Sequence, residues 1–520
     1  MNGPAEEWRP TVNPWIIAAA VMLATFMEVL DTTIVTVALP HIAGSLSAST
    51  DEATWTLTSY LVSNAIVLPA SGWLAKYFGR KRFLLSCIVL FTASSFICGM
   101  AATLGMLVLA RVVQGVGGGA LQPISQAILL ESFPPEKRGM AMAAFALGVV
   151  VAPIIGPTLG GWLTDNYSWR WAFYINIPVG MLAVVMIKAF VEDPPYIRTA
   201  RPGRIDGIGF GLMAVSLATL QIILDRGQQD DWFSADWICW FAVVSVVAFV
   251  AFIVRELLVD EPIVNLRVLT DRNFAVGVVM ITMVGVALYS AITLLPVFLQ
   301  TLMGYPALQS GLAVSPRGIG ALMTMPVVGF LTGRVDFRKL IGVGFVIVAY
   351  SLWWFGDINL SIAMRDIVWP GVLTGVGLSL IFVPLSAVAM GALPQSEMGN
   401  ASGIFNLMRN VGGSVGISAV TTLLIRDAQV HQANMVAHLS PGDIAFGLRS
   451  QALQRYLAGQ YDQVEAARRA GAVIYGELER QATLWAFVNN FRMLAVICMV
   501  CAVTVVFFKK VRGRGGGPVH

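Results

Sequence analysis

Apolar segments long enough to cross a lipid bilayer occupy most of this sequence and leave few alternatives for its fold. A membrane-spanning helix needs about 20 consecutive, mostly apolar residues. The 520-residue chain is 57% hydrophobic and 12% charged, whereas soluble domains carry roughly a quarter charged residues. Because backbone polar groups must be satisfied inside the bilayer, such segments form helices. The sequence therefore predicts an all-α polytopic membrane protein.

We predict fourteen spans from the positions of these apolar runs. The first run is longer than the core of a signal peptide and lacks a basic flank before it, so we expect it to be retained as a span. The spans lie at about 15–38, 54–75, 83–103, 105–130, 141–163, 172–191, 206–224, 235–256, 274–299, 308–331, 340–356, 365–390, 402–424 and 484–508.

Basic residues fall in alternate connections between the spans, which predicts how the chain is oriented. Short cytoplasmic loops are enriched in Lys and Arg, and the other set of short connections holds little beyond Arg170 and Arg226. With an even number of spans, the rule predicts a multi-pass protein of the cytoplasmic (inner) membrane with both termini cytoplasmic. The basic set comprises Lys76, Arg80, Lys81, Arg82, Lys137, Arg138, Arg198, Arg201, Arg204, Arg255, Arg267, Arg272, Arg334, Arg338, Lys339, Lys509, Lys510, Arg512 and Arg514.

One connection, at about 426–483, is long and polar. The span count places it outside the cytoplasm, and its arginines do not oppose this because long loops cross membranes largely regardless of charge. Its residue spacing and its good helix formers predict one or two amphipathic helices.

The sequence also repeats itself at a constant offset. Residues 110–127 align with 370–387, and residues 138–156 align with 398–416. Repeats of this kind are typical of transporters that rock one half against the other around a site near the bilayer midplane. We therefore predict a six-span half at 1–192, two inserted spans with linkers at 193–260, and a second six-span half at 261–520.

The repeat fails at two charged positions inside the apolar runs. Arg111 aligns with Gly371, and Arg409 aligns with Val149. If these arginines only served packing that both halves need, both halves would carry them. These arginines are therefore candidates for function.

Several motifs in this order and spacing resemble the major facilitator superfamily, and in particular its fourteen-span drug:proton antiporters of the EmrB/QacA type. The resemblance covers almost the entire chain. The motifs are the L-D-x-T-I-V-x-V-A-L-P pattern at 30–40, the R-x-x-Q-G pattern at Arg111, Gln114 and Gly115, a Gly- and Pro-rich antiporter motif at 148–161, WRWAFYINIPVG at 169–180, LDRGQQDDWF at 224–233 and FNLMRNVGGSVG at 405–416.

The resemblance implies the major facilitator fold and a function. We expect a proton-coupled antiporter that exports amphipathic or hydrophobic toxic compounds, a multidrug efflux protein of the kind that confers antibiotic resistance. Its partners would be small-molecule substrates and the lipid bilayer, without nucleic acid, and an adaptor protein in the periplasm would dock on residues 426–483. The proton gradient would drive transport, so no cofactor is expected. The alternative is a transporter of the same fold for one physiological metabolite, such as a siderophore, an amino acid or a lipid.

An enzyme is the rival from another class, and the sequence does not favour it. We find no nucleophile–base pair, no set of metal ligands and no G-x-x-x-x-G-K-[ST] phosphate loop, so we expect no catalytic residue and no metal. Cys498 and Cys501 form a C-x-x-C pattern without flanking His or Cys, and we interpret them as two small residues on a lipid-facing helix.

Two acids in the first span, Glu28 and Asp31, are costly there unless they face the protein interior. Asp31 lies in the family motif, and Arg111 is its expected partner, so we predict that this pair couples transport to protons. The alternative is a static structural ion pair. Glu28 lies about 60° from Asp31 on the same helix, and two such acids titrate as a coupled pair. We expect Glu28 to recognise cationic substrates; otherwise it lies in a water-filled vestibule without a role.

The remaining candidates line the cavity, seal the membrane or form a gate. Arg409, flanked by Asn406 and Asn410, would bind anionic groups or hold a gate, and Arg317 would extend to the membrane surface. The other cavity candidates are Gln114, Tyr60 and Tyr289. The expected seal against proton leak comprises Gly148, Pro153, Gly156, Pro157, Gly160 and Gly161. The expected cytoplasmic gate comprises Gly72, Lys76, Gly79 and Arg80, where Lys76 replaces the usual Asp of the family.

Overall fold

The computed structural model describes residues 10–134, 137–194, 206–332, 334–391, 393–437, 439 and 443–508. Within these residues the regular elements are helices, which confirms the all-α prediction. The basic residues predicted at 198, 201 and 204 and at 509, 510, 512 and 514 lie outside the described residues.

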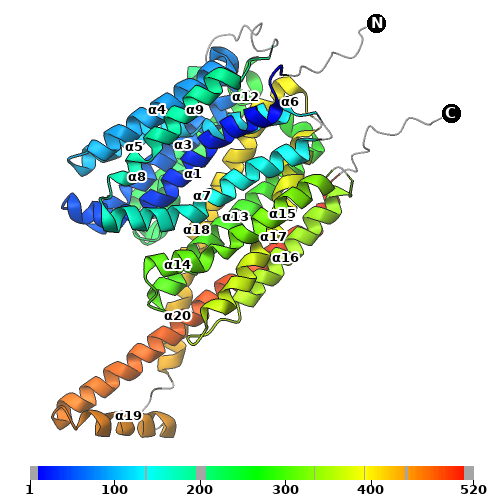
Figure 1. Ribbon diagram of the computed structural model, residues 1–520. Helices are drawn as coiled ribbons and strands as arrows, with labels where there is room; N and C mark the ends of the chain where they lie inside the picture. The colour runs from blue at the N-terminus through cyan, green and yellow to red at the C-terminus, as the bar shows by residue number, and fades with distance from the viewer. Residues whose placement is uncertain are drawn as a thin grey trace, which may run out of the picture.

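The helices follow the predicted spans closely (Figure 1). Helices α5 and α6 share one span, as do α8 and α9, and α14 and α15. The elements are α1 (Pro14–Ser45), α2 (Thr50–Ala53), α3 (Trp55–Phe78), α4 (Arg80–Met100), α5 (Leu104–Gly118), α6 (Leu121–Ser132), α7 (Arg138–Asn166), α8 (Trp171–Tyr174), α9 (Asn176–Phe190), α11 (Gly207–Arg226), α12 (Asp236–Leu258), α13 (Arg272–Thr301), α14 (Ala307–Val314), α15 (Pro316–Leu331), α16 (Phe337–Phe355), α17 (Met364–Gly391), α18 (Met398–Val436), α19 (Ile444–Leu457) and α20 (Gln463–Thr504), with short 3₁₀ turns at Trp232–Ser234, Leu266–Thr270, Gln395–Glu397 and Val505–Phe507.

Twelve of the described helical segments are long and apolar enough to cross a membrane. The two other predicted spans, 54–75 and 402–424, are helical as α3 and α18 but are too polar to meet the same criterion. These two helices pack against each other, one from each predicted half. Many of their polar residues, such as Asn64 of α3 and Asn406 of α18, are buried inside the protein. The count of fourteen spans stays a prediction.

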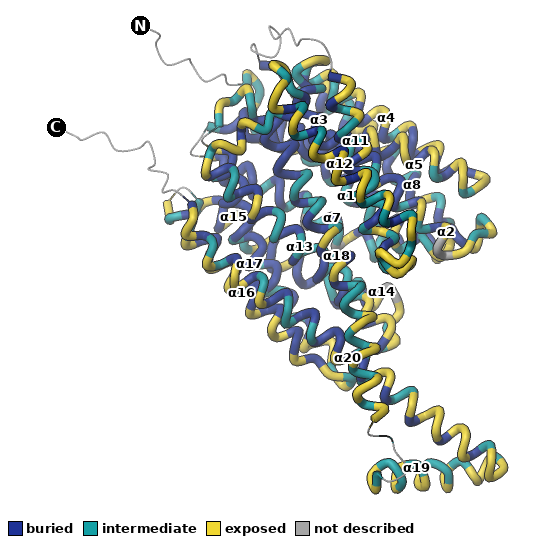
Figure 2. The backbone as a smooth tube through the Cα atoms, turned by 180° about the vertical axis from the view of Figure 1, so that it is seen from behind, coloured by how far each residue is buried: buried dark blue, intermediate teal, exposed yellow. Residues whose placement is uncertain are grey.

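The polar connection at 426–483 is largely helical in its described part, as the sequence predicts. Helix α18 continues to Val436, α19 follows, and α20 begins at Gln463. Figure 1 shows α19 and the first part of α20 projecting as a hairpin beyond the body of the molecule. Figure 2 shows that exposed positions dominate this hairpin, whereas buried positions gather where the helices of the body face one another.

The inserted helices α11 and α12 pack against each other, and α11 also lies against α3 and α18. The LDRGQQDDWF motif closes this contact at the end of α11. Thr58 of α3 donates a hydrogen bond to Asp225, and Trp232 Nε1 donates to Thr422 Oγ1 of α18 at 3.1 Å. The inserted pair thus bridges the two predicted halves.

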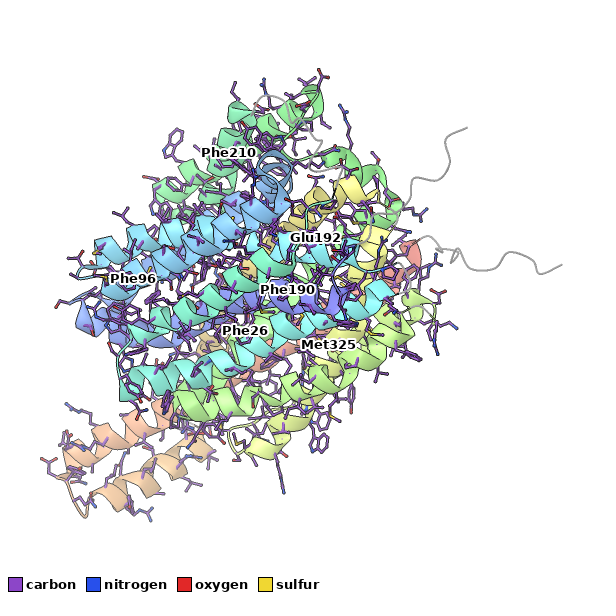
Figure 3. All side chains as sticks on the ribbon, turned by 45° about the horizontal axis from the view of Figure 1, so that its top comes forward. Phe26, Phe96, Phe190, Glu192, Phe210 and Met325 are labelled. Carbon is purple, nitrogen blue, oxygen red and sulfur yellow. The ribbon has the colours of Figure 1, made fainter. Side chains whose placement is uncertain are left out.

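Close packing of helices holds the body together. Helix α7 lies against α1 and α15, and a Cβ added at Gly160 would come within 3.2 Å of the Ile34 Cα. Small residues permit this approach between membrane helices. Figure 3 shows side chains filling the space between the helices, with Met325 of α15 among the fully buried ones.

The two halves meet most closely on the face that carries the basic connections, which we call the basic face (Lys76, Arg80, Lys81, Arg82, Arg138 and Lys339). A Cβ added at Gly72 of α3 would lie 2.5 Å from the backbone nitrogen of Asn400 in α18. Lys76 Nζ lies 3.1 Å from Glu397 Oε1, so one ion pair joins the halves there. The molecule is therefore closed on its basic face.

We predict that reversing either charge of this cross-half pair destabilises the closed state. Lys76→Glu places two carboxylates opposite each other and should impair transport, while the double change Lys76→Glu with Glu397→Lys should restore most of it. Substrate efflux from cells measures both effects. Lys339→Glu, at an exposed position on the same face, is the control. Failure of the double variant to recover any activity would contradict this role.

Candidate functional site

Asp31 and Arg111 form a completely buried ion pair in the first half. Both side chains are 0% exposed, and Arg111 Nη1 lies 2.6 Å from Asp31 Oδ2. Gln114 Nε2 donates to Asp31 Oδ1 at 3.0 Å, and Asn176 Nδ2 donates to the same oxygen at 2.7 Å. Three donors thus converge on one carboxylate, which suits the ionised acid because that form only accepts hydrogen bonds. The structure brings together the pair that the sequence predicts.

The guanidinium of Arg111 is held on several sides. Its Nε donates to the backbone oxygen of Thr56 at 3.0 Å, and Nη1 also donates to Gln114 Oε1 at 2.7 Å. The ring of Tyr60 stacks on it, with the guanidinium carbon 4.1 Å from the ring centroid. The Nη2 atom of Arg111 has no hydrogen-bond partner among the described residues. One donor of the pair is therefore free to take another acceptor.

Glycines on α5 allow this cluster to form. A Cβ on Gly115 would clash with Ser63 and would lie 2.5 Å from the backbone oxygen of Tyr60, and a Cβ on Gly118 would lie 2.5 Å from the Tyr60 hydroxyl. Without these side chains, α5 approaches α3 closely enough for Arg111 to reach both Tyr60 and the Thr56 carbonyl. The R-x-x-Q-G pattern thus supplies the cation of Arg111, the amide of Gln114, and the missing side chain of Gly115 that lets α5 approach α3.

Glu28 lies in a second polar cluster, between the two halves. Asn64 Nδ2 donates to Glu28 Oε1 at 3.1 Å and also lies 3.4 Å from the Tyr60 hydroxyl. Gln122 of α6 lies near Glu28 and accepts a hydrogen bond from Arg409 of α18. The second oxygen of Glu28, Oε2, makes no hydrogen bond with the residues that the structure describes. Tyr60 and Asn64 therefore connect the Asp31 cluster to Glu28, and Gln122 connects Glu28 to the second half.

A third contact between the halves lies one helical turn away. Gln126 Oε1 accepts from Asn406 Nδ2 at 2.6 Å and from Ser402 Oγ at 2.9 Å. Within the part of the chain that the structure describes, four atoms of this contact make no hydrogen bond: Arg409 Nε and Nη1, Asn406 Oδ1 and Gln126 Nε2. These groups are buried where α6 meets α18.

The structure adds residues that the sequence analysis missed. Asn176, Asn64, Gln122 and Gln126 all take part in these clusters. Each is an amide inside an apolar run, which is the one sequence signal available for it. Asn176 lies within the WRWAFYINIPVG motif and also donates to Ser95 Oγ at 3.0 Å, which fixes its orientation.

Several other candidates lie elsewhere. The side chain of Asn410 makes no hydrogen bond with the described residues, and the ring of Tyr289 packs against Gly413 of α18 rather than joining the polar clusters. Arg80 forms a buried pair with Glu131 of α6 inside the first half. Gly79 has a φ of +84°, a conformation that favours glycine.

The antiporter-motif residues lie where α7 packs against α1 and α14. Gly156 and Gly160 face Thr33 and Ile34 of α1, Gly148 faces Met22, and Gly161 faces Val37. Pro157 approaches Gly311 of α14 in the second half. Pro153 is partly buried within the same helix. Helix α7 thus packs against α1 in the first half and α14 in the second half, and the seal against proton leak stays a prediction.

One expectation about side-chain placement is wrong. Arg317 is only 8% exposed instead of extending to the surface, because it begins α15 on the side that packs against α17. Cys498 and Cys501 are buried free thiols on the side of α20 that packs on α16 and α18, while Val500 and Val503 on the other side of this helix are exposed. Among the described residues, no group of three or more His, Cys, Asp or Glu side chains is placed to hold a metal ion.

Comparison with protein families gives a match over most of the chain. Residues 21–417 match the family model described as the Major Facilitator Superfamily. The chain is 37% identical over 507 residues to the multidrug export protein EmrB of Escherichia coli, covering 96% of each chain. It is 37% identical over 419 residues to the fatty acid resistance protein FarB of Neisseria gonorrhoeae, covering 81% of this chain and 82% of the relative.

A solved structure shares the fold. The human organic anion transporter MFSD10 (TETRAN) aligns with a TM-score of 0.59 and 12% sequence identity, over 94% of this chain and all of that chain. At this identity the likeness concerns the fold alone.

Proposed function

Because the chain belongs to the Major Facilitator Superfamily, we propose that it exports amphipathic or hydrophobic toxic compounds in exchange for protons. Relatives named as multidrug export proteins support this, since they are 37% identical and match nearly the whole chain. Export would proceed by alternating access, in which the two halves rock about the buried polar clusters. The chain is a multi-pass membrane protein of a transporter family rather than a member of an enzyme family.

The single observation that carries the proton coupling is the buried Asp31–Arg111 pair. An acid and a base in a low-dielectric site interact strongly while both are charged. A proton arriving on Asp31 removes that attraction and turns the carboxylate from an acceptor into a partial donor. Arg111, Gln114 and Asn176 would then lose their shared acceptor and rearrange. Protonation is thereby linked to the packing of α1 against α5 and α9.

Substrate recognition would fall to the second cluster. One oxygen of Glu28 makes no hydrogen bond within the described part of the chain, and the neutral form of Glu28 would give way to the carboxylate when a cationic substrate arrives. Arg409 would offer its free guanidinium nitrogens to anionic groups when it leaves Gln122. Gln114, Asn406, Asn410, Tyr60 and Tyr289 remain proposed cavity residues, and the α7 residues remain the proposed seal.

The proposed environment is the cytoplasmic (inner) membrane, with both termini on the cytoplasmic side. The clustering of Lys76, Lys81, Lys339 and other cations on the basic face supports this orientation. The proton gradient supplies the energy, so we propose no cofactor. The hairpin of α19 and α20 would project into the periplasm and dock an adaptor protein. Its exposed apolar residues Ile444 and Leu448, 80% and 63% exposed, support such a contact.

The second candidate is export of one physiological metabolite. The name of one relative, a fatty acid resistance protein, supports this second candidate. Growth of a pump-deficient host that expresses the chain, tested across dyes, quaternary ammonium compounds and uncouplers, separates the two functions. Resistance to several unrelated compounds supports multidrug export, whereas resistance to none supports the metabolite transporter.

We predict that Asp31→Asn abolishes proton-driven efflux while the protein still inserts into the membrane. The change keeps the shape of the side chain but removes the proton-binding group. Substrate-induced proton release in everted vesicles measures it directly. Arg111→Ala should be about as damaging, and Arg111→Lys less so if charge matters more than the guanidinium fork. Wild-type proton release by Asp31→Asn would reject the assignment.

We predict that Glu28→Gln selectively loses cationic substrates. The amide cannot become a carboxylate, so a cation gains nothing on binding, while neutral substrates should still be exported with intact proton exchange. Transport assays that compare permanently cationic with neutral dyes measure this. Equal loss of both classes, or of neither, would falsify the division of roles between Glu28 and Asp31.

We predict that replacing residues 440–478 by a short flexible linker spares transport into the periplasm but lowers resistance of whole cells. The body should still fold, because His431 of α18 contacts Asn489 of α20 on the body side of the hairpin. Transport in everted vesicles and drug susceptibility of intact cells are measured side by side. The smaller change Ile444→Ser with Leu448→Ser tests the apolar surface alone. Full resistance after the replacement would show that the hairpin docks no adaptor.

A further inference from the structure

A chain of hydrogen bonds leads from α8 to the Asp31 carboxylate through two polar side chains. The Ser95 hydroxyl of α4 donates to the backbone oxygen of Phe173 in α8 at 2.9 Å. Asn176 Nδ2 of α9 donates to Ser95 Oγ at 3.0 Å and to Asp31 Oδ1 at 2.7 Å. Asp31, Ser95 and Asn176 are each at most 1% exposed. The chain therefore ends on the acid to which we assign the exchanged proton.

The sequence places Asn176 where a membrane span is interrupted. Helix α8 ends at Tyr174 and α9 begins at Asn176. Pro178, in the first turn of α9, has no N–H to donate to the Tyr174 backbone oxygen, so a continuous helix is not favoured here. Ser95 bonds to a backbone oxygen on one side of the interruption and to a side chain on the other. One serine thus holds both ends of the break.

The direction of these bonds determines which atom Asn176 presents to Asp31. A serine hydroxyl has one proton to donate. The Phe173 carbonyl takes that proton, so Ser95 accepts from Asn176. The two protons of the Asn176 amide then go to Ser95 and to Asp31. Turning the amide over would break the bond to Ser95, so Ser95 holds Asn176 as a donor toward Asp31.

A donor held in this way distinguishes the two protonation states of Asp31. The ionised carboxylate accepts the bond, whereas the protonated acid needs an acceptor for its own O–H. Gln114 is likewise set as a donor, because its Oε1 is taken by Arg111 while its Nε2 points at Asp31. Both amides that contact Asp31 among the described residues therefore stabilise the ionised acid.

The other ionisable groups near Asp31 come from three neighbouring helices and from α1 itself. They are Arg111 of α5, Tyr60 of α3, Cys98 of α4 and Glu28 of α1. Residues 139–164 of α7 include no ionisable side chain. The remaining groups on helices that pack on α1 have contacts elsewhere: Asp165 of α7 with His41, Glu52 of α2 with Ser49, Glu131 of α6 with Arg80, Tyr174 of α8 with Gly99, and Lys188 in the last turn of α9.

We propose that Ser95 and Asn176 are positioning residues that set the pH at which the Asp31 site binds its proton. Asn176 acts on Asp31 directly, and Ser95 acts through Asn176 by preventing the amide from turning over. The inference rests on the proposed proton coupling by Asp31 and deepens it, since it names the residues that adjust the pH response of that site.

Two single variants and their combination test this order of action. Asn176→Leu should raise the midpoint pH of proton binding by about one unit, because the ionised acid loses a donor. Ser95→Ala should raise it by less, because the released amide is able to turn and offer Oδ1 to the protonated acid. The double variant should match Asn176→Leu alone, because Ser95 has no amide left to hold.

The midpoint is measured by infrared titration of the purified full-length protein in nanodiscs. The carboxylic acid band of Asp31 is identified by its absence in Asp31→Asn. Efflux in proteoliposomes is followed over the same pH range, and its optimum should move to higher pH in the same order of variants. A purely structural role would lower the maximal rate or the yield of folded protein without moving the midpoint.

The chain offers a matched control for each variant. Ser94 is 1% exposed and adjacent to Ser95, but its hydroxyl donates to the Leu90 backbone oxygen of its own helix at 2.7 Å. Asn490 of α20 is also 1% exposed, and its Nδ2 donates to the Ala486 backbone oxygen at 2.9 Å. Ser94→Ala and Asn490→Leu should both keep the wild-type midpoint.

Three outcomes would overturn the proposal. An unchanged midpoint in both Asn176→Leu and Ser95→Ala rejects the role of the pair, and so does a shift to lower pH. A double variant that shifts further than Asn176→Leu alone shows that Ser95 does not act through Asn176. The proposed function fails separately, when the wild-type protein has no titrating band that Asp31→Asn removes.

Discussion

The buried ion pair between Asp31 and Arg111 is the interaction on which the arrangement of the first half depends. Removing both charges from water is expensive, and their attraction offsets this cost only when the remaining hydrogen bonds are also satisfied. Gln114, Asn176 and the Thr56 carbonyl provide those bonds, and Tyr60 covers the guanidinium. This requirement brings α1, α3, α5 and α9 into one cluster. A proton that neutralises Asp31 therefore acts on four helices at once.

Among the described residues, no Asp or Glu of the second half is buried, and this asymmetry shapes the contact between the halves. Arg409 reaches across to Gln122, whose other neighbour is Glu28, and Asn406 reaches across to Gln126. Backbone contacts at Gly72 and the Lys76–Glu397 pair close the basic face beside them. In the proposed mechanism, opening that face would separate Arg409 from Gln122 and expose Glu28. Rocking of the halves would thereby control the access of substrates to both charged groups.

The sequence predicted most of the fold and the central pair, because both leave strong local signals. Apolar runs of span length are hard to mistake, and an acid such as Asp31 inside one is conspicuous. Helices α3 and α18 were predicted as spans, but their buried polar residues lower their hydropathy below that of the twelve others. The partners of Asn176 and Gln122 were not predictable, since an amide in a span does not reveal which distant helix it meets. Arg317 was misjudged because its burial depends on the packing of α15 against α17, which appears only in three dimensions.

The central claim is that Asp31 binds the proton that is exchanged for substrate. Infrared difference spectroscopy of the purified protein tests it most directly. The substrate is neutral, so that its binding is not expected to change the protonation of Glu28. Asp31 should give a carboxylic acid band in the substrate-free protein at low pH, and substrate binding should remove it. The account predicts that this change persists in Glu28→Gln and vanishes in Asp31→Asn. An undiminished band change in Asp31→Asn would contradict it.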